Sequence, residues 1–389
     1  MNGGRHRAGR LRELLISGVA DSFGMALGWT VLVLLALSRG GLAEAALYNA
    51  AMLLGVVLSA PVTGWLTHRY SGRHLLRGAA GIEMLLRVGA LAGLLAGLPS
   101  GLIAVAVVLM HIAAWVGFAA MRAEVAAVDA GPRSMTRYAL AIAAVEAAGT
   151  GVAALLPNSP TGGTLIAIYL VYAGSLLPTI RSARRARTAP RRTRRRTRGG
   201  SLAVSPRLLA AGGVVMLVAS GPTLLAVPLT TELHGRHWVA GAAVAFSLGC
   251  LLATVAVHAI GTMRLPAVLR WSLWGLGMLV GWITAPYHAI SVIAAQFLAG
   301  LSQTAFEGDM DAQVAAKAPP DAVTTALAYS ASSRALGGSI AVKLLPVMVL
   351  AQGIDKAVST MSLLLGVAAL LLWALTSMPW IHRGRVATG

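Results

Sequence analysis

Apolar runs of about 20 residues recur along the whole chain, and short segments with glycine, proline or charged residues separate them. A helix needs about 20 mainly apolar residues to cross a bilayer, whereas a membrane-spanning strand needs only about 10 of alternating polarity. The runs have the helical length and lack the alternation, so they predict an all-α integral membrane protein. Twelve transmembrane helices are predicted, at 12–36, 44–66, 76–97, 101–120, 137–156, 161–181, 206–231, 238–260, 268–286, 288–308, 325–350 and 358–380.

The composition narrows the class of protein further. Of the 389 residues, 57% are apolar and 12% are charged, and the mean hydropathy is +0.74. Soluble domains carry about 25% charged residues, so an ordinary soluble globule is excluded. The single Cys250 excludes an intrachain disulfide and a cysteine-rich metal site.

Lysine and arginine fall mostly on one side of the predicted topology. The termini and the even-numbered loops hold 26 of the 32 basic residues, and the odd-numbered loops hold 3. Basic residues collect in the cytoplasmic loops of membrane proteins. We therefore predict a multi-pass protein of the cell membrane with both termini in the cytoplasm.

A weak internal repeat divides the chain into two halves. A shift of 189 residues aligns the end of the fourth span and the fifth span with the end of the tenth and the eleventh. Repeated halves of this kind are common in transporters. The predicted domains are a six-helix bundle over 1–181, a linker over 182–205 and a second, pseudo-symmetric six-helix bundle over 206–389.

The linker carries nine arginines between Arg184 and Arg198 and no acidic residue. This composition favours a topogenic segment that touches anionic lipid. It has no aromatic residue that could stack on a base, so we expect the lipid bilayer and not a nucleic acid as its partner.

With six plus six spans and a long central loop, the chain resembles the major facilitator superfamily of transporters. The sharpest local match is the loop after the second span, where the family pattern is G-x-L-a-D-r-x-G-r-r. The chain keeps Gly64, Leu66, Arg69, Gly72 and Arg73, and it has His68 at the acidic position and one extra residue before Gly72. In the family this acid helps to latch the two halves on the cytoplasmic side, so the resemblance implies a gate at this loop. Glu124, at the end of the fourth span, could contribute by meeting Arg69 or Arg73.

The stretch Met121–Gly151 also looks like the branch that exports drugs and siderophores, in which a short loop leads into a fifth span with glycines. The Gly-Pro step of that branch is absent here. The resemblance implies a small-molecule substrate. We expect a monomer without cofactor or metal, in which protons are the coupling ion.

Ionisable residues inside the spans are the first functional candidates, because inserting each one costs about 2.5–3.5 kcal/mol. Asp21 lies about ten residues into the first span, and Glu146 lies about nine into the fifth. Burial makes a carboxylate bind a proton more readily, so both are candidates for proton coupling. The alternative for each is an acid paired or hydrogen-bonded at a helix contact.

Arg334 lies one residue from the position that the repeat makes equivalent to Glu146. The two charges could face each other across a cavity, or each could be satisfied within its own half. In the family, spans 1, 4, 7 and 10 line the central cavity. The resemblance therefore makes Trp29, His111 and Trp115 substrate-cavity candidates alongside Arg334, and packing in the core or against lipid is the alternative for them.

No catalytic pattern stands in the sequence: it has no H-E-x-x-H, Walker loop, G-x-S-x-G or dinucleotide fingerprint. We therefore expect neither an enzyme nor an ATP-driven pump. The prediction is a secondary active transporter that works by alternating access and exports a small, partly apolar molecule in exchange for protons. An importer on the same fold and a non-transporting membrane protein that kept the fold are the alternatives.

Overall fold

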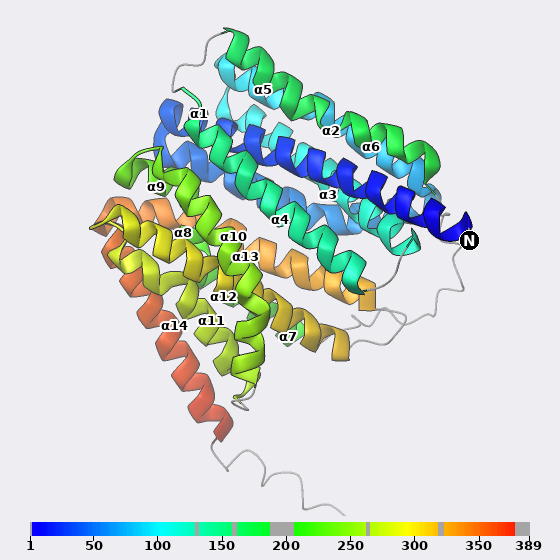
Figure 1. Ribbon diagram of the computed structural model, residues 1–389. Helices are drawn as coiled ribbons and strands as arrows, with labels where there is room; N and C mark the ends of the chain where they lie inside the picture. The colour runs from blue at the N-terminus through cyan, green and yellow to red at the C-terminus, as the bar shows by residue number, and fades with distance from the viewer. Residues whose placement is uncertain are drawn as a thin grey trace, which may run out of the picture.

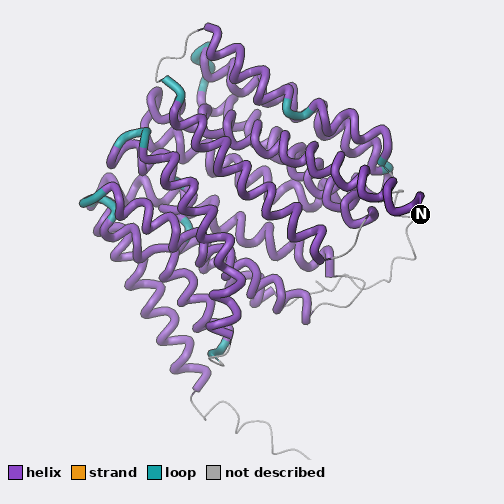
Figure 2. The backbone as a smooth tube through the Cα atoms, in the orientation of Figure 1, coloured by secondary structure: helices purple, strands orange, loops and turns teal. Residues whose placement is uncertain are grey.

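The computed structural model describes residues 2–128, 132–157, 162–186, 206–261, 265–317 and 323–377. Helices make up nearly all of these ranges, and no strand occurs within them (Figure 2). The predicted all-α fold class is therefore confirmed. The linker beyond residue 186, the end of the chain beyond residue 377 and the side chain of His68 lie outside the described residues.

Two groups of helices follow each other along the chain (Figure 1). The N-terminal half contains α1 (Asn2–Arg69), α2 (Gly72–Leu95), α3 (Ser100–Val128), α4 (Pro132–Leu155), α5 (Gly162–Gly174) and α6 (Leu177–Ser182). The C-terminal half contains α7 (Pro206–Ala219), α8 (Gly221–Leu224), α9 (Ala226–His234), α10 (Trp238–Gly261), α11 (Ala267–Thr284), α12 (Ala289–Lys317), α13 (Val323–Gln352) and α14 (Ile354–Ser377).

Helix α1 contains the first two predicted spans, joined by a kink instead of a loop. The backbone leaves helical geometry at Gly40 and Gly41, and Gly41 has a φ of 65°. Glycine adopts this left-handed conformation without the steric cost that a Cβ atom brings. Just beside the kink, Arg39 donates hydrogen bonds to Glu44 (3.1 Å) and to the Tyr48 hydroxyl (2.8 Å). The glycine pair thus permits the break, and the Arg39 network fixes its geometry.

Two predicted spans are discontinuous in the structure. The sixth breaks between α5 and α6, and the seventh is divided into α7, α8 and α9. A proline is the second residue of α6, at Pro178, and of α8, at Pro222. Proline suits the first turn of a helix, whereas inside a helix it removes one backbone hydrogen bond and clashes with the preceding turn. The apolar run predicted the length of each span but not these breaks.

Seven helical segments among the described residues are long and apolar enough to cross a membrane, and the kinked α1 accounts for one of them. Shorter apolar helices occur at Ala144–Leu155, Pro206–Ala219 and Trp238–Ala253, which lie within the predicted spans 5, 7 and 8. The chain is a multi-pass membrane protein. The division into two six-helix bundles remains a prediction.

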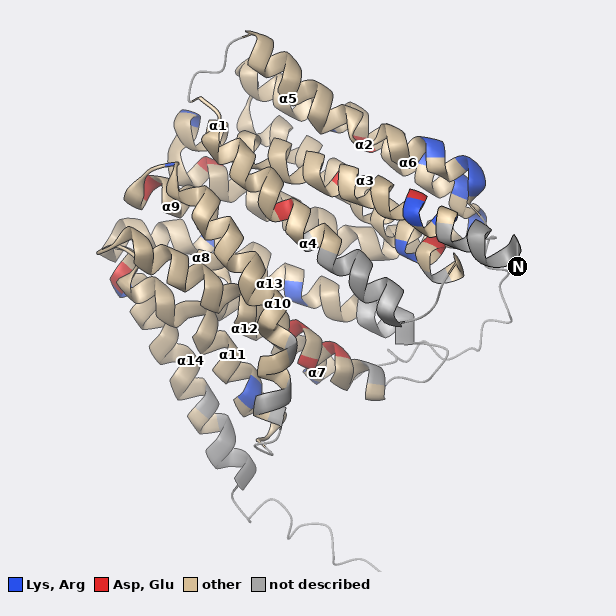
Figure 3. Ribbon diagram, in the orientation of Figure 1, with Lys and Arg blue, Asp and Glu red and all other residues tan. Residues whose placement is uncertain are grey.

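The two halves meet along two seams. Helix α1 packs on α13, and α4 packs on α10, whereas the other large helix contacts lie within one half. Described arginines cluster at the end of the helices near the N terminus, which we call the basic end (Figure 3). The end with the Gly40–Gly41 kink is called the opposite end. That the basic end faces the cytoplasm remains a prediction.

Candidate functional site

A buried charge cluster occupies the middle of the N-terminal half. The Arg87 guanidinium donates from Nη2 to Oδ1 of Asp21 (2.6 Å) and also to Oε1 of Glu83. Its Nε lies 3.0 Å from the same Glu83 oxygen, and its Nη1 lies 2.7 Å from the Tyr172 carbonyl and 3.0 Å from the Ser175 hydroxyl. The Arg87 and Glu83 side chains are 1% and 3% exposed, and the Asp21 side chain is 30% exposed. The cluster therefore has one more carboxylate than it has cations.

Local sequence explains why these groups meet. Glu83 and Arg87 are four residues apart on α2, which places them on the same face of the helix. The break after α5 leaves the Tyr172 carbonyl available, because the Leu176 N–H bonds to Ala173 instead of completing the helical ladder. A buried carbonyl without a partner is costly, and both Arg87 and the Ser175 hydroxyl (3.1 Å) donate to this one. The break in the sixth span is thus part of the construction of this site.

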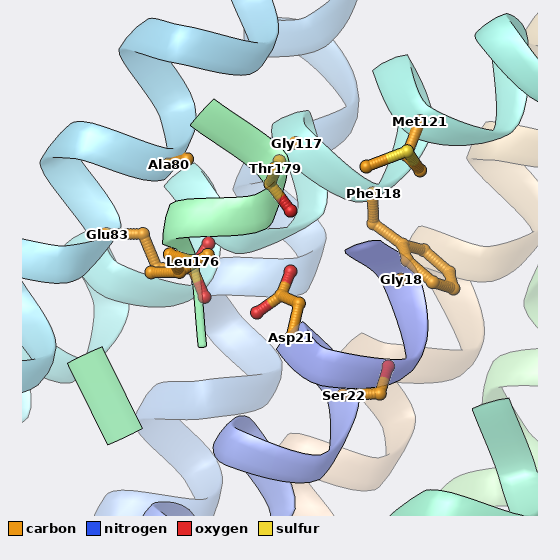
Figure 4. A pocket seen from close by; sticks show the side chains of 10 residues that line it. All are labelled: Gly18, Asp21, Ser22, Ala80, Glu83, Gly117, Phe118, Met121, Leu176 and Thr179. Carbon is orange, nitrogen blue, oxygen red and sulfur yellow. The ribbon is translucent and has the colours of Figure 1, made fainter. Parts of the chain in front are cut away.

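The structure shows how Asp21 is paired, and its role in proton coupling remains a prediction. Asp21 is paired at a helix contact, as the alternative reading expected, and its partial exposure leaves it accessible. It also lines a small cavity, together with residues of α2, α3 and α6 (Figure 4).

Glu146 lies on an exposed face of α4. The exposed apolar residue Leu155 lies nine residues further on, which corresponds to half a turn away around the helix. Glu146 and Leu155 therefore lie on opposite sides of α4. The nearby cation is Arg122 of α3, whose guanidinium lies 4.3 Å from the centre of the Phe118 ring.

Arg334 forms its ion pair within the C-terminal half and not with Glu146. Its guanidinium binds both carboxylate oxygens of Asp311, at 2.6 and 3.3 Å, and the Ser330 hydroxyl at 2.9 Å. Ser330 also donates to Asp311 (3.0 Å), so the three groups form a closed triangle. The Arg334 side chain is 7% exposed and that of Asp311 is 39% exposed. Of the two arrangements left open by the sequence, the structure has the one in which Arg334 is satisfied in its own half.

The repeat relates the charges of the two halves with their signs reversed. Under the shift of 189 residues, Arg122 falls on Asp311, and Glu146 falls one residue from Arg334. The N-terminal half therefore has a cation on α3 and an acid on α4. The C-terminal half has an acid on α12 and a cation on α13.

The predicted gate residues lie at the basic end. Gly64, Arg69 and Arg73 are exposed, and Arg69 stacks over Trp65 at 4.2 Å. Gly72 is buried at the start of α2. Glu124 is fully buried. Its Oε2 lies 3.9 Å from Nη2 of Arg10 in α1, a different arginine from the two that the sequence suggested.

The remaining cavity candidates pack within the N-terminal half. His111 is buried, its Nδ1 lies 2.9 Å from the Val107 carbonyl, and its ring meets Trp29 edge-on at 4.9 Å. Trp115 is partly exposed and packs edge-on against Phe118. Of the described residues that line the two cavities, none is Arg334, Trp29, His111 or Trp115.

The second cavity lies at the opposite end, between the halves. It has a volume of about 430 Å³ and is mainly apolar. Its walls come from α1, the residues just after α4, α5, α9 and the segment after α9. They include Val31, Leu34, Leu35, Leu37, Ser38, Leu156, Pro157, Ile168, Thr231, Gly235 and Arg236.

Arg236 joins the two halves beside this cavity, where α4 packs on α10. Its guanidinium donates to the carbonyls of Ala153 (2.6 Å) and Pro157 (3.4 Å) at the C-terminal end of α4. The last carbonyls of a helix have no partner within the helix and carry its negative dipole end, so a cation there is favourable. Burial lowers the pKa of Arg236, yet an arginine stays charged at any physiological pH. The contact therefore holds the two halves together at the opposite end.

We predict that Arg236→Ala loosens this seam. A Cβ atom at Gly151 would lie 3.6 Å from that of Ala240, a separation that suits a disulfide. In a chain with Cys250 replaced, the pair Gly151→Cys and Ala240→Cys should therefore cross-link readily. Adding Arg236→Ala should slow cross-linking about tenfold, since a charge-assisted hydrogen bond contributes about 1.5–3 kcal/mol. Arg39→Ala, which removes an ion pair inside the N-terminal half, should leave the rate unchanged, and equal rates in all three chains would refute the role of Arg236.

The sequence alone did not predict which residues pair with Asp21 and Arg334. The Glu83–Arg87 spacing within an apolar span was the signal for the first cluster, because two opposite charges four residues apart are neighbours on a helix. Asp311, the partner of Arg334, lies three residues beyond the tenth predicted span, outside the segments in which an acid is conspicuous. The neighbouring acid Asp309 pairs with Arg270, at 2.8 and 3.0 Å.

Comparison with known proteins supports the fold. No family model matches the sequence, and no curated protein matches it. Solved structures do match: a mutant of the nucleoside transporter NupG has a TM-score of 0.71 at 11% identity, covering 94% of this chain and 99% of that one. A mutant of the peptide transporter POT has a TM-score of 0.71 at 12% identity, covering 94% of both chains.

The xylose transporter XylE from E. coli, in an inward-open conformation, matches with a TM-score of 0.64 at 15% identity, covering 92% of this chain and 95% of that one. These are transporters of the major facilitator type, and none of them is an enzyme. The chain has the all-α fold of these membrane transporters, which confirms the predicted fold. At these identities the likeness is one of fold alone.

Proposed function

We propose that the protein is a secondary active transporter that works by alternating access and exports a small, partly apolar molecule in exchange for protons. The observation that carries the proposal is the pair of seams between the halves. Ser339 donates to the Ala50 carbonyl (3.2 Å) and Ser332 to the Val57 carbonyl (3.4 Å), while Arg236 closes the other seam near the opposite end. Because so few hydrogen bonds join the halves, few have to break when two rigid bundles rock against each other.

The character of the cavity supports the proposed class of substrate. Most of the residues around the 430 Å³ cavity are apolar, and its polar groups are few. Ligand sites commonly have mainly apolar walls and a small number of polar groups that fix orientation. This cavity would suit a lipophilic solute better than a sugar or a phosphate.

Locking the seam tests alternating access. In proteoliposomes, oxidation of the Gly151→Cys, Ala240→Cys pair should abolish transport of a responsive compound, and reduction should restore it. A substrate-induced rise in Tm across a compound panel would identify that compound. Full transport by the cross-linked protein would contradict the mechanism. Accumulation in the reverse direction would indicate an importer, and no transport of any compound would favour the non-transporting alternative.

Proton coupling makes a separate prediction for Asp21 and Glu146. Asp21→Asn and Glu146→Gln keep the size of each side chain and remove its titration. We expect at least one of them to lose uphill transport driven by a pH gradient while downhill exchange continues. Glu232→Gln, which changes an exposed acid of α9, is the matched control. Unchanged uphill transport with unchanged pH dependence in both single variants and in the double variant would remove both acids from the coupling role.

A further inference from the structure

The small cavity beside Asp21 has room for about one water-sized particle. Its volume is about 10 Å³, and it is enclosed by α1, α2, α3, α6 and the break before α6. A cavity of roughly this size is the smallest that holds a water molecule. Four oxygen-bearing side chains line it, those of Asp21, Ser22, Glu83 and Thr179 (Figure 4).

The Thr179 hydroxyl marks the cavity as a binding site. Thr179 is 3% exposed, and among the described residues its Oγ1 has no hydrogen-bond partner. Figure 4 shows this hydroxyl directed toward the Asp21 carboxylate. Buried polar groups are nearly always paired, so an unpaired hydroxyl aimed into a cavity indicates a particle that pairs with it.

The charge balance specifies that particle. Arg87 contacts Oδ1 of Asp21 and Oε1 of Glu83, which leaves Oδ2 and Oε2 for another cation. Two carboxylates and one guanidinium leave a single negative charge in the interior of the bundle. One monovalent cation neutralises it, whereas a divalent ion would leave an uncompensated positive charge. Carboxylate and hydroxyl oxygens are the ligands that hard cations prefer.

We propose that Asp21, Glu83, Ser22 and Thr179 bind a monovalent metal cation such as Na⁺, held beside Arg87. The partly exposed Asp21 is the point of access, and the buried Glu83 is the inner ligand. The site would accept Na⁺ where the proposed function places a proton, so the two would compete for Asp21. Only that link to coupling rests on the proposed function, because binding can be measured without transport.

The test is thermal unfolding of the purified full chain in detergent at fixed pH. NaCl is compared with choline chloride at equal ionic strength, since choline is too large for the cavity. We expect Na⁺ to raise Tm saturably by roughly 2–8 °C, because a ligand that binds only the folded state stabilises it by mass action. The same rise with KCl would support a monovalent site of low selectivity.

Two variants locate the effect. Thr179→Val removes the hydroxyl and keeps the shape of the side chain, and Glu83→Gln removes the inner charge. Both should lose most of the Na⁺-dependent rise. Thr230→Val is the matched control, because Thr230 is another fully buried threonine whose hydroxyl has no partner among the described residues, and it lies in the C-terminal half. This control should keep the full rise.

Two outcomes would overturn the proposal. One is a wild-type Tm that is equal in NaCl, KCl and choline chloride. The other is a Na⁺-dependent rise that survives in both Thr179→Val and Glu83→Gln. A saturable rise without any transport would leave the cation site standing and reject the transporter, so the two failures are distinguishable.

Discussion

Arg87→Met is expected to lower the free energy of unfolding by about 3–5 kcal/mol, the range for breaking a buried ion pair from one side. The methionine is apolar and of similar length, but it leaves Asp21 and Glu83 beside each other without their shared cation. Two adjacent carboxylates cannot both stay ionised in such a site. The substitution also removes the Arg87 donors to the Tyr172 carbonyl and to the Ser175 hydroxyl, and it leaves the carbonyl with the Ser175 hydroxyl as its donor. The measurement is the Tm of the purified protein and its yield as a monodisperse peak.

The control for this prediction lies on the same helix. Arg77 of α2 is exposed, so Arg77→Met should change Tm by less than about 1 °C. A second substitution tests the cause. Glu83→Gln added to Arg87→Met removes the buried carboxylate that has lost its cation, so it should recover part of the lost stability. If the double variant is no more stable than Arg87→Met alone, the loss has another origin, such as the missing bond to Tyr172. An Arg87→Met protein as stable as wild type would refute the prediction.

Arg334→Ala is expected to abolish transport while the protein still folds. The guanidinium is nearly buried and stays charged. Its bidentate contact with Asp311 therefore compensates for the lost hydration of that charge. The acid left behind differs from Glu83, because the Asp311 side chain is 39% exposed and can be hydrated. The cost in stability should therefore be about 1–2 kcal/mol, below that of Arg87→Met. We expect transport to fall because the ion pair that joins α12 to α13 is lost.

Arg334→Lys should restore only part of the transport rate, since a point charge does not replace a planar fork that binds two carboxylate oxygens and Ser330. Arg207→Ala changes an exposed arginine at the start of α7 and should leave transport intact. Transport is measured as the initial rate in proteoliposomes that contain equal amounts of each variant. An alanine variant that transports at the wild-type rate would show that the Arg334–Asp311 pair serves packing alone.

Most of the fold was predicted from the length of the apolar runs and the positions of the basic residues. Every predicted span coincides with helix in the described residues, because a bilayer imposes both a length and a helical backbone on apolar segments. The breaks beside Pro178 and Pro222 were not predicted. A proline in a membrane helix can be accommodated with or without a break, depending on which neighbours satisfy the freed backbone groups. At the first break that neighbour is Arg87, a contact 85 residues away in the sequence.

The candidate site was predicted only in part for a similar reason. Asp21 was found because an acid in an apolar span is conspicuous by itself. Its partner could be named only once α1 and α2 were placed side by side, since nothing in the sequence fixes which helix faces which. The same holds for Arg334, where Glu146 and Asp311 were both available and the packing of α12 on α13 selected Asp311.

The sign reversal between Arg122 and Asp311 has a consequence for how the protein closes on itself. Near a pseudo-twofold axis, a residue of one repeat comes close to its own counterpart in the other. Two faithful copies would thus bring like charges together, and every charged position near the axis would resist closure. With the sign inverted in one copy, equivalent positions attract wherever the two repeats meet. If the predicted division into two repeats holds, the halves carry opposite charges at these equivalent positions, as the two different chains of a heterodimer can, and a protein assembled from two N-terminal halves would carry like charges there.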